Sequence, residues 1–497
     1  MHTNRVSRRR FLRGATMTTA SALVAACAAP LPAPQVIERT VEVEKVITSE
    51  PQVIEKEVPV EVAVEKVVTA TPPADKQPVT LRYQEKAPVQ GWTEQLVLPV
   101  FEEMYPWIEV VFEPRVSGWI EKNLAMMAAG TAPDIIHAWG EVFQSYSAKK
   151  QLLNLTPAIE AGMTQEELDD QHKFQWDAFW DPFRQVRFAL PRQVDMQFIY
   201  YNKDIFDQRG VAYPKEDWTY DDWAAAAQKA TVLDEAGNPK VWGVHTWLDS
   251  WTFLSTHLNA FGAHIRDDDT WMKCRLSEAG AKEWFQWQQD RIFKDKTWLN
   301  ANTLTGIGAS GDSVGMFASE LFSMAEINLN SIGQISQQVN FNWDIMHPPV
   351  GPGGRFGLGD NDGFAIYSGV ANRGEAQVEA AWLFTKFMNG PFFQRPNMEQ
   401  TGELPGRKSL IPEYVDVVKR KFPGTENVDV NMVIRAFDMG YMVPGENFRY
   451  QAEVAPIVNA AMQKLWEVGD AGPEILDQVC AEVDATEAQA YEADPDK

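Results

Sequence analysis

The chain changes character abruptly near residue 79, and this change limits what can fold to the residues beyond it. Residues 28–78 contain no aromatic side chain and carry repeated prolines among alternating Val, Glu and Lys residues. The alternation alone would fit a β-strand, but no turn brings two such stretches together. We interpret the segment as a charged, extended spacer, which reaches ~170 Å at full stretch and ~40 Å as a flexible coil. A packed core is therefore expected only from residue 79 onward.

The first 26 residues have the pattern of an export signal. Arg8 and Arg9 lie in a twin-arginine motif, and a short apolar stretch of small residues follows it. That stretch is too short and too rich in Ala and Thr to span a bilayer, which argues against a retained helix. It ends in Leu-Val-Ala-Ala-Cys, which resembles a lipoprotein cleavage box. We expect removal of residues 1–26 and lipidation of Cys27, so that residues 27–78 become a disordered spacer anchored at the outer face of the membrane or in the periplasm.

The body of the chain is acidic and rich in aromatic residues. The formal net charge is −24, and the chain contains 18 Trp and 26 Phe. A surface of this charge repels nucleic acid and anionic lipid headgroups, so neither is expected as a ligand. About 470 residues remain after the signal, which is too many for one core, and two lobes are expected.

Short apolar strands alternate with helical patterns along the body. The clearest helix is predicted at 379–388, and another at 96–104 with a kink at Pro99. Alternation of this kind predicts an α/β fold with a mostly parallel sheet. The strands are predicted at 79–83, 108–112, 134–136, 197–201, 242–244, 322–327 and 364–366.

Two matches to catalytic motifs lie side by side at residues 306–315. Both G-x-G-x-x-G and G-x-S-x-G require a buried strand immediately before them, whereas residues 300–305 are polar and predict a loop. Asp344 and His347 follow Ser313 in the order of a hydrolase triad, but they stand only three residues apart, next to prolines. We predict a crossover loop there and no catalytic site.

Metal-binding spacing is absent from the sequence. No two histidines stand at i, i+4, and no two cysteines are close together. Residues 267–269 and 360–363 are acidic enough to attract Ca²⁺, but without the distal Glu of an EF-hand they are interpreted as solvated loops. Neither a metal nor a cofactor is expected. Cys274 and Cys480 either form a disulfide or remain two buried thiols.

Three tryptophans stand where α/β sheets place ligands. Trp139 follows the strand predicted at 134–136, and Trp247 and Trp251 follow the strand predicted at 242–244. Flat aromatic rings complement the apolar faces of sugars, while charged and amide groups bind the hydroxyls. The sequence therefore indicates a carbohydrate site, although about half of the tryptophans should be ordinary core residues.

Several segments resemble the sugar-binding lipoproteins of ABC importers, the extracellular solute-binding family related to maltose-binding protein. The resemblance covers about residues 79–467, and the segment at 198–206 is its most specific part. Residues 317–324 depart from the family pattern because they lack its small Gly-Lys turn. The segments that carry the resemblance are 129–136, 152–157, 198–206, 218–223, 381–388 and 402–408.

The resemblance implies a type II periplasmic-binding-protein fold, in which two α/β lobes are joined by hinge strands. A ligand would lie between the lobes, and closure would signal its presence to a permease without any chemistry on the ligand. The implied divisions are lobe 1 at 79–190 and 351–395, lobe 2 at 198–342 and 396–497, and hinge crossings at 191–197 and 343–350.

The resemblance also implies ligand-binding residues in both lobes and in the hinge. They are Glu85, Lys86 and Trp92 after the first strand; Trp139 and Glu141 after the third; Gln193 and Asp195 in the hinge; Trp247, Trp251, Asn328 and Asn330 in lobe 2; and Asn361, Asp362 and Arg407 on returning loops.

The expected function is capture of a mono- or oligosaccharide by a monomeric, membrane-anchored protein that delivers it to ABC permease subunits. No enzymatic activity is expected. A secreted glycoside hydrolase is the alternative, and it would need two carboxylates at a fixed separation in the cleft. A surface solute sensor without a permease is a further alternative that the sequence does not separate from the first. The identity of the sugar and the resting state of the lobes, open or closed, are left open.

Overall fold

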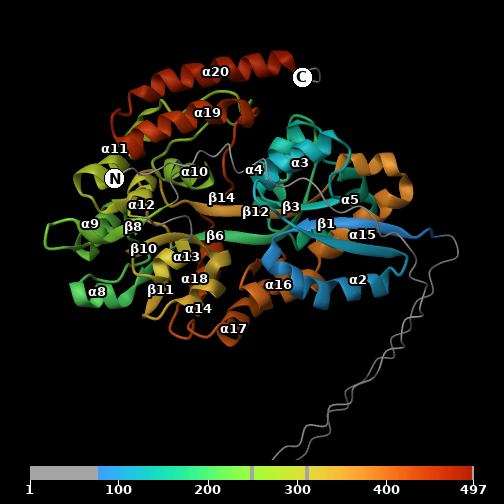
Figure 1. The fold of residues 1–497 in the computed structure, drawn as a ribbon, viewed down its shortest axis with the longest axis horizontal. Helices are drawn as coiled ribbons and strands as arrows, with labels where there is room; N and C mark the ends of the chain where they lie inside the picture. Colours follow the sequence, from blue (N-terminus) through green and yellow to red (C-terminus); the bar gives the residue numbers. More distant parts are fainter. Residues whose placement is uncertain (1–75, 247–250, 308–312, 495–497) are drawn as a thin grey trace, which may run out of the picture. The chain divides into compact units, whose positions relative to one another are not determined.

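The computed structural model describes residues 76–246, 251–307 and 313–494 (Figure 1). The predicted export motif at Arg8 and Arg9, the predicted lipidation site at Cys27 and the predicted spacer up to residue 75 lie outside the described residues. Within the described ranges, no helix is both long enough and apolar enough to cross a bilayer.

A mixed sheet of 12 strands forms the framework of the described chain, and a two-stranded hairpin stands apart from it. The main path runs in the order β2–β1–β3–β12–β6–β10–β8–β7, with β11 and β13 paired to β6, β14 to β12 and β9 to β8. The strands are β1 (Val79–Glu85), β2 (Ile108–Pro114), β3 (Ile135–Ala138), β6 (Leu190–Asn202), β7 (Val232–Leu233), β8 (Pro239–His245), β9 (Trp298–Leu299), β10 (Phe322–Asn328), β11 (Trp343–Met346), β12 (Gly357–Ile366), β13 (Leu404–Pro405) and β14 (Met442–Val443), and the hairpin is β4 (Trp180–Asp181) with β5 (Val186–Arg187).

The prediction of a mostly parallel sheet is wrong, because the two longest strands run antiparallel to most of their neighbours. β1 pairs in parallel with β2 and β3, and β8 with β9 and β10. In contrast, β12 is antiparallel to β3 and β6, and β6 is antiparallel to β10 and β11. β6 and β12 come from distant parts of the chain and lie side by side in the centre of the sheet. The overall path of the chain therefore sets the direction in which each strand runs. The local alternation of strands and helices does not encode it.

All seven predicted strands are present, and β6 and β12 begin seven residues before their predicted starts. The helix predicted at 379–388 is the centre of a longer one, α15 (Glu375–Asn389). Pro99 lies in the first turn of α2 (Leu98–Met104), directly after a π-helical turn (Thr93–Val97). The irregularity expected at this proline therefore lies just before it, because the first turn of a helix tolerates proline.

Twenty α-helices surround the strands of the described chain, and side-chain caps fix several of their starts. Asn202 ends β6 and accepts a hydrogen bond from the Ile205 N–H at 3.0 Å, which begins α8. The helices not yet given are α1 (Gln90–Trp92), α3 (Trp119–Ala128), α4 (Gly140–Ala148), α5 (Thr156–Gly162), α6 (Gln165–Asp169), α7 (Lys173–Ala178), α8 (Lys203–Arg209), α9 (Tyr220–Ala230), α10 (Trp251–Ala260), α11 (Ala279–Gln289), α12 (Ala301–Gly306), α13 (Ser313–Ala318), α14 (Ile332–Gln338), α16 (Pro391–Thr401), α17 (Ile411–Lys421), α18 (Asn431–Met439), α19 (Gln451–Met462) and α20 (Ile475–Ala493).

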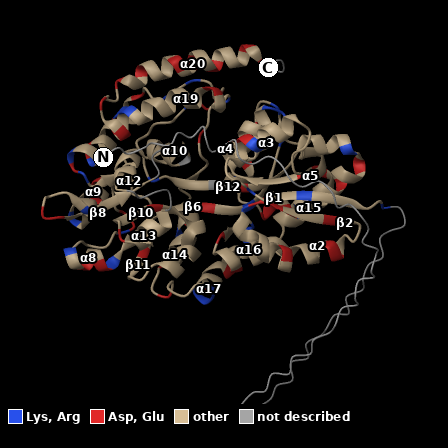
Figure 2. Ribbon diagram, in the orientation of Figure 1, with Lys and Arg blue, Asp and Glu red and all other residues tan. Residues whose placement is uncertain are grey.

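Two separate hydrophobic cores form on the sheet, and we use them to define two lobes. Lobe 1 surrounds the core that contains Tyr83 and Phe384, and lobe 2 surrounds the core that contains Trp223. β6 contributes to both, with Leu190 in the first core and Val194 in the second. Acidic residues occur along the helices and also within the central strands β1 and β6 (Figure 2). Buried charge therefore lies where the two cores adjoin.

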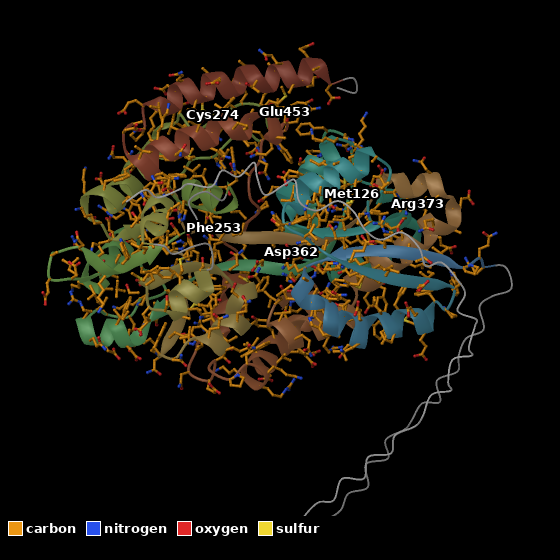
Figure 3. All side chains as sticks on the ribbon, viewed as in Figure 1. Met126, Phe253, Cys274, Asp362, Arg373 and Glu453 are labelled. Carbon is orange, nitrogen blue, oxygen red and sulfur yellow. A yellow bond between two sulfur atoms is a disulfide. The ribbon has the colours of Figure 1, made fainter. Side chains whose placement is uncertain are left out.

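Cys274 and Cys480 form a disulfide, which settles the alternative that the sequence left open. The bond joins the segment that follows α10 to the C-terminal helix α20 across 206 residues of sequence. Cys274 is labelled in Figure 3.

The region of the catalytic motif matches contains helices. The loop predicted at 300–305 is wrong, because Asn300 accepts a hydrogen bond from the Thr303 N–H at 2.9 Å and caps α12. Ser313 begins α13, and residues 308–312 lie outside the described chain. Asp344 lies in β11 and accepts from a backbone N–H of Asp429, while His347 contacts the hydroxyl of Tyr441. These partners do not form a hydrolase triad.

Candidate ligand-binding site

Charged and polar side chains from four neighbouring strands meet where the lobes join. The register of β12 places Asp362 opposite Gln193 of β6, and it places the next residue of β12 opposite Ala138 of β3. β3 in turn lies beside β1, which ends at Glu85. Asp362 is labelled in Figure 3. The sheet thus brings together residues that are up to 277 positions apart in sequence (Glu85 and Asp362).

We call the first group the buried charge cluster: Glu85, Lys86, His137, Arg192, Asp362 and Glu403. Glu85 lies 2.6 Å from His137 Nδ1 and 3.2 Å from Arg192 Nε. Arg192 Nη1 lies 2.6 Å from Glu403, and His137 Nε2 lies 3.3 Å from Asp362. Lys86 Nζ lies 3.5 Å from both Asp362 and Glu403.

Within the buried charge cluster, neighbouring Lys, His or Arg side chains compensate the negative charge of each carboxylate. Burial alone would raise the pKa of Glu85, but His137 and Arg192 outweigh it and hold that pKa well below its usual range. The pKa of Asp362 is likewise lowered, because Lys86 and His137 outweigh the effect of burial. Carboxylates held in this way remain ionised, and they fix the relative positions of β1, β3, β6 and β12.

Two further carboxylates adjoin the cluster without such compensation, and no ion pair is formed by either among the described residues. Asp195 of β6 accepts hydrogen bonds from the backbone N–H and the side-chain amide of Asn330. Glu141 accepts one from Trp139 Nε1 at 3.0 Å, and its other oxygen is buried without a partner. Burial first, and then repulsion from Asp362, raises the pKa of Asp195 to about 8. Burial raises the pKa of Glu141 to about 7.

We call this second group the acceptor region: Trp139, Glu141, Asp195 and Asn330. Trp139 stands just before the N-terminus of α4, at the carboxyl end of β3, and packs edge-on against Trp119 at 5.5 Å. Arg115 stacks over Trp119 at 4.0 Å and donates to the carbonyl of His137, which ties the region to the cluster. Carboxylate oxygens beside an indole ring are the acceptors and the apolar face that a hydroxyl-rich ligand requires.

Several residues singled out from the sequence are brought together. Glu85, Lys86, Gln193, Asp195, Asn330 and Asp362 lie in or against the cluster, and Trp139 bonds to Glu141 beside it.

Three other residues that were predicted to bind the ligand lie outside the buried charge cluster and the acceptor region. Trp92 packs against Phe393 in the core of lobe 1, at 5.7 Å between ring centroids. Trp251 begins α10 and packs against a phenylalanine of lobe 2. Arg407 is buried and donates to the carbonyl of Asn389, so its role is to hold chain segments together.

The remaining expectations concern three residues and the segment 360–363. Trp247 and the side chain of Asn361 lie outside the described part of the structure. Asn328 ends β10, and its side-chain oxygen is buried without a partner. The interpretation of residues 360–363 as a solvated loop is wrong, because they belong to β12 and Asp362 is 4% exposed. Sheet pairing with β3 and β6 buries a segment whose composition alone is typical of a loop.

Sequence reasoning missed His137, Arg192, Glu403, Arg115 and Trp119. A histidine inside the otherwise apolar strand β3, and an arginine inside the predicted hinge, were available signals of buried charge. Glu403 had no such signal, because its partner Arg192 is 211 residues away. Among the described residues, no group of three or more His, Cys, Asp or Glu side chains is arranged to hold a metal ion.

A polar site between two α/β lobes defines a binding protein of the two-lobed class. The family model for bacterial extracellular solute-binding proteins matches residues 84–391, well over half of the chain, and the chain belongs to this family. The family binds solutes and is not one of enzymes, and its members act outside the cytoplasm.

Solved structures with the same fold include three that differ in ligand. An ABC substrate-binding protein of Listeria monocytogenes, Lmo0181, in complex with cycloalternan is 21% identical with a TM-score of 0.70, over 84% of this chain and 100% of that one. Maltose-bound MalE3 of T. maritima is 17% identical with a TM-score of 0.66, over 82% and 99%. UgpB of Mycobacterium tuberculosis, in complex with glycerophosphocholine, is 14% identical with a TM-score of 0.66, over 83% and 98%. The two-lobed fold that the resemblance implied is confirmed.

Proposed function

We propose that the protein captures a carbohydrate between its lobes and delivers it to the permease of an ABC importer. The observation that carries this proposal is the acceptor region, in which Glu141 bonds to Trp139, Asp195 bonds to Asn330, and neither carboxylate forms an ion pair among the described residues. Saccharide hydroxyls donate well to such carboxylates, and the indole face covers the apolar side of a sugar ring. The cycloalternan and maltose complexes of proteins with the same fold support this ligand class.

We also propose the lobe boundaries implied by the sequence, with one change. Residues 343–346 form β11, which packs into the core of lobe 2, and β12 then reaches the core of lobe 1. The second crossing therefore belongs in β12 (Gly357–Ile366) and not at 343–350. The proposed lobe 1 is then 79–190 with the chain from β12 to residue 395, and the proposed lobe 2 is 198–356 with 396–497.

Membrane attachment is part of the same proposal. Export through the Arg8-Arg9 motif and lipidation of Cys27 would keep the binding protein close to its permease, on a spacer that ends near residue 78. One acyl chain gives only reversible attachment, so stable anchoring needs at least two on Cys27. A monomer that performs no chemistry on its ligand is sufficient for this role.

A ligand panel in a thermal-shift assay tests the proposal. The full chain is heated with monosaccharides, malto-, manno- and cello-oligosaccharides, polyols and glycerophosphocholine. A saccharide present at about 100 times its Kd stabilises the folded state by about 2.7 kcal/mol. A shift with glycerophosphocholine or polyols and none with any saccharide would contradict the carbohydrate assignment, and steady hydrolysis of a glycoside would contradict the transport role in favour of a hydrolase.

A further inference from the structure

A pocket opens between the lobes, apart from the cluster and the acceptor region. Lobe 1 contributes α4 and the β4–β5 hairpin to its walls, and lobe 2 contributes the segment around Trp271 and the residues before α19. Aromatic side chains dominate the lining, among them Trp180, Phe183, Trp271 and Tyr450. The two tryptophans are half-buried, so each keeps part of its ring accessible to a ligand.

The walls have the chemistry of a sugar subsite. Phe183 and Trp271 meet edge to face across the lobes, with centroids 5.3 Å apart. The guanidinium of Arg449 stacks over Phe183 at 4.3 Å. The backbone N–H of Arg449 donates a hydrogen bond to the Trp271 carbonyl at 3.0 Å. On the other wall, Asp181 accepts from the Ser147 hydroxyl at 3.1 Å. Aromatic rings bordered by a guanidinium and a carboxylate complement the apolar face and the hydroxyl edge of a sugar ring.

One face of α4 connects this pocket to the acceptor region. Glu141, Gln144 and Ala148 stand at i, i+3 and i+7, so they share one stripe of the helix. Glu141 belongs to the acceptor region, whereas Gln144 and Ala148 line the pocket. The stripe extends ~10 Å along the helix axis at 1.5 Å per residue. Gln144 accepts a hydrogen bond from Asn447 of lobe 2 at 3.0 Å, so the route runs between the lobes.

We propose that the pocket lined by Trp180, Phe183, Trp271 and Tyr450 is a second saccharide subsite, which binds a distal ring of an oligosaccharide whose first ring occupies the acceptor region. This inference rests on the carbohydrate function proposed above and specifies the ligand as an oligosaccharide. Because both lobes supply the walls, a ring bound there contacts both of them and favours their close approach.

Isothermal titration of the full chain with ladders of malto-, manno- and cello-oligosaccharides of one to seven units tests the proposal. In the ladder that binds, we expect Kd to fall about tenfold or more at the length that reaches the pocket. Trp180→Ala and Trp271→Ala, one from each lobe, should each abolish that gain and leave Kd for the shortest bound member within twofold. Trp382→Ala, a half-buried tryptophan of α15 remote from this pocket, is the matched control and should retain the gain.

Two results would overturn the subsite. One is a Kd that does not depend on chain length, and the other is an equal loss for short and long members in both variants, provided that their circular dichroism spectra match the unmutated protein. If one variant fails to fold, the other decides the outcome, because the two tryptophans belong to different lobes. Failure of all saccharides to bind would instead contradict the proposed function, and the subsite with it.

Discussion

The buried charge cluster and the acceptor region adjoin each other, yet their carboxylates are in opposite states. In the cluster, Glu85 and Asp362 are held ionised by His137, Arg192 and Lys86. In the acceptor region, Asp195 and Glu141 are bonded only to amide and indole N–H groups. Asp195 is as deeply buried as Glu85 and Asp362, so the difference lies in the partners. Compensated charge maintains the arrangement of the strands, whereas uncompensated carboxylates are left to bind a ligand.

The comparison of the buried charge cluster with the acceptor region predicts the largest effect, a loss of stability, for a substitution of Arg192. Arg192→Met leaves Glu85 and Glu403 buried without their shared cation, and we expect the free energy of unfolding to fall by about 3–5 kcal/mol. Chemical denaturation measures this change. Arg395→Met is the control, because Arg395 forms a comparable pair with Glu413 on the surface, where both side chains are more than 40% exposed, and the expected loss is about 0–1 kcal/mol. Equal losses in the two variants would show that the cluster does not maintain the fold.

The second prediction concerns ligand affinity at Asp195. At pH 9, where Asp195 is ionised because its pKa is about 8, Asp195→Asn removes a charged acceptor, and we expect about 1.5–3 kcal/mol weaker binding of the saccharide with the largest thermal shift, or roughly 10- to 100-fold in Kd. Titration calorimetry measures the change. Asp344→Asn is the matched control, because burial raises the pKa of Asp344 too, but its hydrogen bonds go to backbone N–H groups within lobe 2. Unchanged affinity in Asp195→Asn would remove this residue from the site.

The third prediction is a pH dependence of stability. The pKa of Asp195 is about 8 in the folded protein and about 4 in an unfolded chain. Between these values the folded state holds the extra proton, so its stability falls as pH rises and levels off above about pH 8, by at most ~1.4 kcal/mol per pH unit for one group. Denaturation at pH 5 to 9 should show a smaller slope for Asp195→Asn than for the unmutated chain. Identical slopes would mean that Asp195 is not protonated near neutral pH.

The smallest effect is expected at Lys86, the one member of the cluster that is partly exposed. Its two carboxylate partners lie at 3.5 Å, and its side chain is 29% accessible. Lys86→Met should therefore lower the free energy of unfolding by about 1 kcal/mol, well below the loss for Arg192→Met. A loss as large as that of Arg192→Met, measured in the same denaturation assay, would show that the two cations contribute equally.

Local sequence pattern predicted the elements of this fold well and their directions poorly. The apolar residues at alternate positions of 79–83 identify β1, because Val79, Leu81 and Tyr83 are buried while Thr80 between them is exposed. The antiparallel course of β6 and β12 depends on which lobe each strand comes from, and no short window contains that information. The site residues also fall into those that local sequence could predict and those that it could not. Residues at or just after the ends of strands, such as Glu85 and Trp139, could be predicted as site residues from their position in the sequence alone. The contact between Arg192 and Glu403 could not, because it depends on the folded path of the chain.

The ladder between β12 and β6 has a register shift between Asp362 and Gly363. A bulge lets a sheet bend and twist at one point, whereas a continuous ladder resists both. Asp362 contacts Lys86, His137 and Gln193, so bending there would displace three side chains of the site together. The point at which this ladder can bend thus coincides with charged residues of the site, so a change of charge at Asp362 would also affect how the two strands bend there.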